Sequence, residues 1–211
     1  MTDFTKANIE LREIKLYNST HASTTLNEHW RKMCVIISVT EFEKCLKKAI
    51  TRFLGDPKSR FVELVKVLEA TERKEQEYVY SRFGKSCEKN GIYNIAEKFF
   101  KLVGNTIANQ IKSKSFDYFV NCQKKLYARD IAKVRIAHDT RNDMTRELSI
   151  IEATTYDESQ DLFLELIKLR NEVAHQYTLD SSYTIVEVID KFHRAKLFVG
   201  AVEAALVRCT K

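Results

Sequence analysis

Hydrophobic residues recur at steps of three or four along most of the chain, a spacing that places them on one face of an α-helix. This pattern predicts a long helix from about residue 26 to 54 and a last helix from about residue 184 to 208. It also predicts a penultimate helix from about residue 160 to 176, which Asp157 or Ser159 can cap. The chain is therefore expected to be mainly helical.

Two further segments extend this pattern toward the N-terminus. Asp56 followed by Pro57 is a good N-cap and first-turn pair, and it predicts a helix that continues to Tyr80. An amphipathic segment over residues 4–18 precedes a stretch of cap-forming hydroxyl residues, so it predicts a short helix that ends before the main body begins. We expect residues 1–20 to form an N-terminal helical arm and residues 21–211 to form a single helical domain.

The middle of the chain is less regular. Apolar segments at 92–103, 106–111 and 116–137 are interrupted by glycines and by the polar runs SKS and HDTRND. We interpret these segments as short helices. With no internal repeat and no low-complexity tract, the pattern as a whole predicts an all-α helical bundle.

Composition supports this fold class and narrows the chemistry. One proline and five glycines in 211 residues are too few for the many turns of an all-β fold. The 44% of hydrophobic residues is enough to bury a full core. A net charge of +6 and a pI near 9.0 permit a polyanionic partner without requiring one.

The five cysteines show no CxxC pair and no Cys/His cluster of the kind that zinc requires. We therefore expect no metal site and no cofactor, and we interpret the cysteines as reduced thiols. The first 20 residues have no apolar core of signal-peptide length, and no uncharged apolar run approaches the length of a membrane span. The sequence thus favours a cytoplasmic protein that does not associate with a membrane.

The stretch LRNEVAHQY, residues 169–177, carries the strongest candidate chemistry. Asn171 and His175 are four residues apart and share a helix face, whereas Arg170 lies five residues before His175, roughly 140° around a straight helix. A long arginine stem can reach around from its own face if the last helical turn opens into a loop. The three side chains are therefore candidates for one cleft at the helix end.

In residue type and spacing, this stretch resembles the HEPN family (higher eukaryotes and prokaryotes nucleotide-binding domains). Ribonucleases of that family carry an arginine, usually followed by a polar residue, and a histidine after four to six intervening positions; here four residues separate Arg170 from His175. The position of RNEVAH between a leucine-rich helix and one final amphipathic helix is similar to the prokaryotic RiboL-PSP type. The predicted helical hairpin over residues 26–82 is also similar to that arrangement.

This resemblance implies a metal-independent endoribonuclease that acts on RNA at the interface of a symmetric homodimer, where the motifs of both chains face one cleft. It also implies a toxin or a defence-associated effector, because a free ribonuclease would harm its own cell. Such an activity requires restraint by an antitoxin or another regulatory protein, or by the arm at residues 1–20.

The residue types suit this chemistry independently of the family. Cleavage of RNA through its own 2′-hydroxyl needs a group that transfers protons near neutral pH and a cation that binds phosphate oxygens. His175 suits the first role and Arg170 the second, while Asn171 is placed to orient the histidine or to donate to phosphate. The expected products carry a 2′,3′-cyclic phosphate and a 5′-hydroxyl.

Two other interpretations stay open at this point. Basic residues are favoured in the last turn of a helix, where they bind free carbonyls, so RNEVAH also fits a plain helix C-terminus. A HEPN fold that keeps the motif but binds a nucleotide or a protein partner without catalysis is the other alternative, because fold does not determine function.

Outside the motif the signals are weaker. Basic residues follow one another from Lys112 to Arg135 with aromatic residues between them, a mixture that suits an RNA backbone or, more commonly, an amphipathic helix with a solvated basic side. His138 lies between two arginines, and we interpret it as a solvated helix end that could also contact an RNA phosphate. For His193 we expect a surface or capping role, although its position on the helix after the motif would also allow it to line the cleft. The candidate RNA-binding residues are Lys124, Lys125, Arg129, Lys133 and Arg135.

Overall fold

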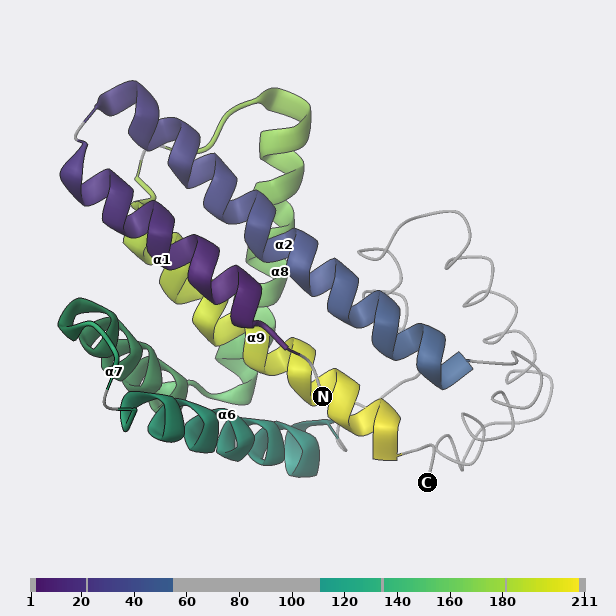
Figure 1. Cartoon of the computed structure of the whole chain (residues 1–211). Helices are drawn as coiled ribbons and strands as arrows, with labels where there is room; N and C mark the ends of the chain where they lie inside the picture. Colours follow the sequence, from purple (N-terminus) through teal and green to yellow (C-terminus); the bar gives the residue numbers. More distant parts are fainter. Residues whose placement is uncertain (1–2, 22, 55–110, 134, 181, 209–211) are drawn as a thin grey trace. The chain divides into compact units, whose positions relative to one another are not determined.

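The computed structural model describes residues 3–21, 23–54, 111–133, 135–180 and 182–208. The elements are α1 (Thr5–Thr20), α2 (Thr24–Leu54), the π-helix η1 (Ile111–Ser115), α6 (Phe116–Ile131), α7 (His138–Ala153), α8 (Tyr156–Gln176) and α9 (Ile185–Arg208) (Figure 1). These residues contain no strand, so the prediction of an all-α fold is confirmed. None of the helices among them is both long and apolar enough to cross a bilayer.

The chain divides into two compact units. One unit, which we call the motif unit, comprises Thr2–Phe42 and Phe119–Val199, and the other contains the remaining residues. The motif unit holds α1, the first part of α2, most of α6 and α9, and the whole of α7 and α8. The candidate site lies entirely within it.

The predicted helices at both ends of the chain are found close to their expected bounds, as α1, α2 and α9. The helix that carries the motif begins earlier than the pattern indicated. Neither Asp157 nor Ser159 caps it; the N-cap is Thr155, whose hydroxyl accepts a hydrogen bond from the backbone N–H of Glu158 at 3.3 Å. Thr155 and Glu158 have the spacing of a capping box, which moves the start of α8 to Tyr156.

The largest difference from the predicted elements is α7. The sequence pattern predicts that the polar run HDTRND interrupts the helices, but this run forms the first turns of α7. The preceding helix ends at Ile131 rather than near residue 137. Three residues of α7 are buried at helical spacing, Met144, Glu147 and Ile151. A glutamate among them broke the apolar stripe by which an amphipathic helix is recognised. The predicted helices at 57–80 and 92–103, and nearly all of 106–111, lie outside the described residues.

Aromatic packing around α9 forms the core of the motif unit. The Phe192 ring stacks on Phe42 of α2, with centroids 5.4 Å apart, and Phe198 contacts Phe163 of α8 at 5.1 Å. From Ala195 to Val199 every residue of α9 is buried, as expected of a helix that is covered on all sides. Figure 1 shows α9 with α1 and α2 on one side and the α6–α7 hairpin on the other.

Helix α1 packs against this core. Phe4, immediately before the helix, makes edge-to-face contacts with Phe42, Phe119 and Phe192, at centroid distances of 6.2, 6.4 and 6.0 Å. The buried residues of the helix itself are Ala7, Leu11 and Ile14. The division of the chain into an arm and a domain stays a prediction.

Candidate functional site

The motif residues lie in the last turns of α8. Leu169 and Val173 are buried and anchor this end of the helix, while Arg170 and Asn171 are half-buried and His175 is exposed. The helix stays regular through Gln176, so its last turn does not open before His175. Arg170 and His175 therefore lie on helix faces about 140° apart, and convergence of the two within one chain stays a prediction.

Asn171 and His175 share the exposed face of α8 with Lys168 and Leu164. Each lies within about 60° of the others around the helix, because they are three, four, seven or eleven residues apart. Leu164 is 41% exposed and is one of the few large apolar side chains of the described region that point to solvent. The face that presents the imidazole is thus partly apolar and partly basic.

The imidazole of His175 is not occupied by helix-end contacts. His21, at the end of α1, shows the ordinary arrangement: its Nδ1 lies 2.8 Å from the Thr20 hydroxyl and 3.2 Å from the Tyr17 carbonyl oxygen. Within the described part of the chain, neither the His175 imidazole nor the Asn171 side-chain amide has a hydrogen-bond partner. His175 is the basic residue of the last turn of α8, so the interpretation of the motif as a plain helix C-terminus stays open beside the functional one.

Helix α8 ends at a residue with a left-handed backbone. Tyr177 has φ 56° and ψ 18°, and its N–H donates to the Val173 carbonyl oxygen at 3.2 Å. This turn directs the chain back toward the N-terminal part of α2. There the ammonium of Lys32 lies 5.4 Å from the centroid of the Tyr177 ring and is paired with Glu28 at 2.6 Å.

These neighbours on α2 were not identified from the sequence. Lys32 is buried, and Arg31 beside it donates from Nη1 to the carbonyl oxygens of Asp180 and Tyr183, at 3.3 and 2.8 Å. Both contacts join residues about 150 positions apart, so the spacing of residues within one segment cannot predict them. The one available signal was Tyr177, two residues after His175, at the end of α8 where glycine is usually favoured.

The basic residues of α6 do not join the motif. Lys124 pairs with Glu152 at 3.8 Å, and Arg129 and Lys133 both pair with Asp130, at 3.2 and 2.7 Å. Lys125 and Arg135 are exposed, whereas the aromatic rings of Phe119 and Tyr127 are buried. Figure 1 shows α6 away from the C-terminal end of α8, so α6 has the structure of an amphipathic helix with a solvated basic side, and an RNA contact there stays a prediction.

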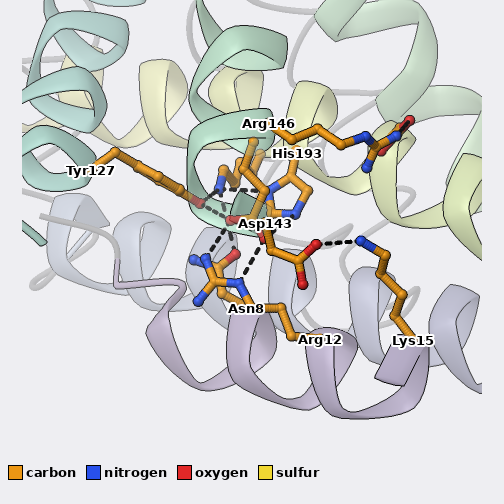
Figure 2. A network of polar contacts seen from close by, with 10 residues as sticks. Asn8, Arg12, Lys15, Tyr127, Asp143, Arg146 and His193 are labelled. Carbon is orange, nitrogen blue, oxygen red and sulfur yellow. Dashed lines mark hydrogen bonds and ion pairs between the residues drawn. The ribbon is translucent and has the colours of Figure 1, made fainter. Parts of the chain in front are cut away.

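The two other histidines singled out from the sequence have different surroundings. His138 is the first residue of α7, with its side chain 86% exposed, in agreement with a solvated helix end. His193 is fully buried, so the expectations of a surface role and of a place lining the cleft are both wrong. Its position on α9 turns the ring inward, toward α1 and α7 (Figure 2).

His193 belongs to a buried polar network that joins four helices (Figure 2). At its centre the carboxylate of Glu147 accepts two hydrogen bonds from the Arg12 guanidinium, through Nε at 2.7 Å and through Nη2, and one from the Tyr127 hydroxyl at 2.8 Å. His193 Nε2 lies 3.5 Å from the same carboxylate. One buried anion is thus shared by α1, α6, α7 and α9.

Lys196 completes this network. Its Nζ lies 2.8 Å from the Tyr127 hydroxyl, 2.9 Å from His193 Nδ1 and 3.4 Å from Asn8 Oδ1. Burial lowers the pKa of Lys196 to about 7, an effect that Glu147 opposes and Arg12 reinforces. Burial and the nearby Lys196 ammonium also hold the pKa of His193 well below its ordinary value.

The lowered pKa of Lys196 predicts that the free energy of unfolding depends on pH. Between about pH 7 and pH 10 the unfolded chain holds the Lys196 proton more tightly than the folded chain, so the free energy of unfolding rises with pH across this window. Below pH 7 both states are protonated and the cost of burying the charge is constant. Replacing Lys196 with methionine should remove the contribution of this titration to the free energy of unfolding.

The measurement is urea denaturation of the parent and the Lys196→Met variant at several pH values from 6 to 10. We expect the variant to be the more stable protein at pH 7 and its advantage to shrink as the pH approaches 10. An advantage that does not change with pH would contradict the prediction. Because the same comparison is made at each pH, titrations common to both proteins cancel.

A cavity of about 530 Å³ lies elsewhere in the motif unit, between α8 and α9. Its two cations are already paired, Lys191 with Glu165 at 2.9 Å and Arg194 with Glu158. The lining residues are Glu158, Leu162, Ser182, Tyr183, Glu187, Asp190, Lys191 and Arg194, and none belongs to the motif. The described residues also contain no cluster of histidine, cysteine and carboxylate side chains that could hold a metal ion.

Comparison with known proteins places the chain in a family. The family model described as RiboL-PSP-HEPN matches residues 2–207. No curated protein and no solved structure matches the chain. The match covers almost the whole sequence, including the motif and the helices that surround it.

Proposed function

Because the chain belongs to the RiboL-PSP-HEPN family, we propose that it is a metal-independent endoribonuclease that cleaves RNA by attack of a ribose 2′-hydroxyl on the adjacent phosphate. His175 transfers the proton to or from the reacting oxygens, and Arg170 binds the phosphate oxygens through its planar fork. Asn171, on the face of His175, donates to phosphate or orients the imidazole. The products carry a 2′,3′-cyclic phosphate and a 5′-hydroxyl.

One observation carries this proposal. An imidazole at a helix end with no hydrogen-bond partner in the described residues is available to a substrate, whereas a histidine retained for capping would bind the free carbonyls, as His21 does. Half-buried Arg170, one position before Asn171, brings a permanent cation to the same end of α8. A general acid or base and a cation are sufficient for this reaction without a metal ion.

A second copy of the chain completes the proposed site. Arg170 and His175 face different directions on one helix, and a two-fold axis near the end of α8 would bring the Arg170 of one copy toward the His175 of the other. The exposed Leu164, on the same face as His175, gives this surface an apolar contact. The resulting enzyme is a homodimer whose activity is restrained by an antitoxin or another regulatory protein, as a toxin or defence effector requires.

The test is incubation of the purified protein with total RNA in the presence of EDTA. We expect fragments whose 3′ ends are 2′,3′-cyclic phosphates, recognised because alkaline phosphatase, which hydrolyses only phosphate monoesters, cannot remove them until acid has opened the ring. Cleavage that requires Mg²⁺ would show that the site is assigned wrongly. Intact RNA together with a stable dimer would instead favour a non-catalytic module that binds a nucleotide or a protein.

A further inference from the structure

Tyr177 combines two features that the fold itself does not require. It is the only described residue other than glycine with a positive φ, in the left-handed region where a Cβ is disfavoured. Its side chain is also 75% exposed, more than any other large hydrophobic residue of the described region. A glycine would end α8 with less strain and would expose no ring.

The ring is nevertheless held in place. The Lys32 ammonium approaches it at 5.4 Å from the centroid, and this ammonium is itself fixed by the Glu28 carboxylate at 2.6 Å. A cation in this position attracts the electron-rich face of an aromatic ring. With Lys32 buried and Tyr177 exposed, the rest of the ring surface is left to solvent.

The backbone that follows Tyr177 is held as well. Leu179 is buried, and Arg31 binds the carbonyl oxygens of Asp180 and Tyr183. The segment ends in a capping box, in which Thr184 and Glu187 exchange hydrogen bonds of 2.7 and 3.1 Å at the start of α9. The described residues of the connection between α8 and α9 are therefore held by contacts with α2 and by the capping box.

We propose that Tyr177 is a stacking platform that binds one base of the RNA next to the phosphate held by the motif. This proposal rests on the ribonuclease function proposed above, and it adds a binding residue to that site. Tyr177 follows His175 by two residues, so a base on its ring lies within one or two nucleotides of the imidazole. The exposed ring follows a motif that contains Arg170 and His175, and an aromatic surface combined with positive charge is typical of sites that bind single-stranded nucleic acid.

Stacking of this kind tolerates every base, because each has an aromatic face. The subsite therefore favours unpaired RNA over a duplex, whose bases are already stacked, and it selects little between sequences. Arg31 and Lys32 act as positioning residues for the platform.

The test measures RNA binding separately from cleavage. The probe is a fluorescent single-stranded oligonucleotide with 2′-O-methyl riboses, which cannot be cleaved by 2′-hydroxyl attack, and binding to the full chain is followed by anisotropy. Tyr177→Gly should weaken binding about 5-fold to 150-fold, the range of one stacked base. Tyr177→Phe keeps the ring and should stay within about 2-fold of the parent.

Thermal denaturation of the same proteins separates stacking from damage to the fold. Because glycine adopts a positive φ freely, the Tm of Tyr177→Gly should be unchanged or raised by up to about 4 °C. Tyr17, another exposed tyrosine, lies on α1 outside the motif and the basic stretch, and Tyr17→Ala should leave the affinity unchanged. Weaker binding with an undiminished Tm supports the platform.

Equal affinity of the parent and Tyr177→Gly would overturn the platform, and cleavage of RNA by both would leave the proposed ribonuclease function standing. Equal losses in Tyr177→Gly and Tyr177→Phe would also overturn it, because the hydroxyl rather than the ring face would then bind RNA. If the parent neither binds the probe nor cleaves RNA, both proposals fail together.

Discussion

Replacing Glu147 with glutamine should lower the free energy of unfolding by about 3–5 kcal/mol, the usual cost of removing one partner from a buried ion pair. Glu147 is only 3% exposed and accepts hydrogen bonds from Arg12 and Tyr127. Without its charge, the half-buried Arg12 guanidinium loses the carboxylate that accepts its hydrogen bonds, and Lys196 loses the carboxylate that favours its protonated form. Glutamine preserves the volume, so the loss is mainly electrostatic.

Asp143→Asn is the matched control for this prediction. Asp143 also lies on α7 and pairs with a cation of α1, Lys15, but both side chains are nearly a third exposed. Solvent screens such a pair, so the control should cost less than about 1 kcal/mol. Both variants are compared with the parent by urea denaturation followed by circular dichroism.

A double substitution tests how much the Arg12–Glu147 ion pair as a whole contributes to the free energy of unfolding. Replacing both Arg12 and Glu147 with methionine removes the charges together, and such replacements are often neutral or stabilising. We expect the double variant to be more stable than Glu147→Gln alone. If Glu147→Gln unfolds within about 1 kcal/mol of the parent, the network does not stabilise the fold in the way its geometry indicates.

Replacing His175 with alanine should reduce the rate of RNA cleavage by about 10²- to 10⁴-fold, the usual contribution of a general acid or base. Arg170→Ala should cost about 10²- to 10³-fold through loss of phosphate stabilisation, and Arg170→Lys should recover part of it, because lysine keeps the charge but not the planar fork. The measurement is the initial rate on a labelled single-stranded RNA in EDTA. The far-UV spectrum of His175→Ala should match that of the parent, since His175 is exposed.

His138→Ala serves as the control. His138 is also an exposed histidine among arginines, but it lies at the start of α7, and its loss should change the rate by less than 2-fold. Retention of more than a tenth of the parent rate in His175→Ala would exclude this imidazole as the proton-transfer group. Equal losses in both histidine variants would point to binding of RNA by general positive charge.

The bounds of several helices and the family of the protein could be predicted from the spacing of residues within single segments. The bounds of α2 and α9 and the end of α8 could be predicted within a few residues, because each has a continuous apolar stripe and a recognisable end. α7 was missed for the opposite reason: its buried face includes a glutamate, and a glutamate in a sequence is normally read as solvated. The resemblance of RNEVAH to the HEPN pattern predicted the family, and the family match confirms it.

The buried polar network and the surroundings of the motif could not be predicted in this way. Arg12 and Glu147 are 135 residues apart, and Asn8 and Lys196 are 188 apart. Lys32 and Tyr177 meet only because α2 passes beside the end of α8. A charged residue in a sequence does not indicate whether it will be solvated or paired, since that depends on which other helices cover it.

The sequence by itself determined the all-helical class, the apolar faces of the main helices and the position of Arg170, Asn171 and His175 at the end of one helix, because each of these depends on spacing within a single segment. Only the tertiary structure decided that His193 and Lys196 are buried around Glu147 and that the His175 side chain has no partner in the described residues. It also decided that Tyr177, which has a positive φ, is exposed and lies next to the Lys32 ammonium. These properties arise from contacts between distant segments, whose free energies depend on burial and charge at positions that no local pattern specifies.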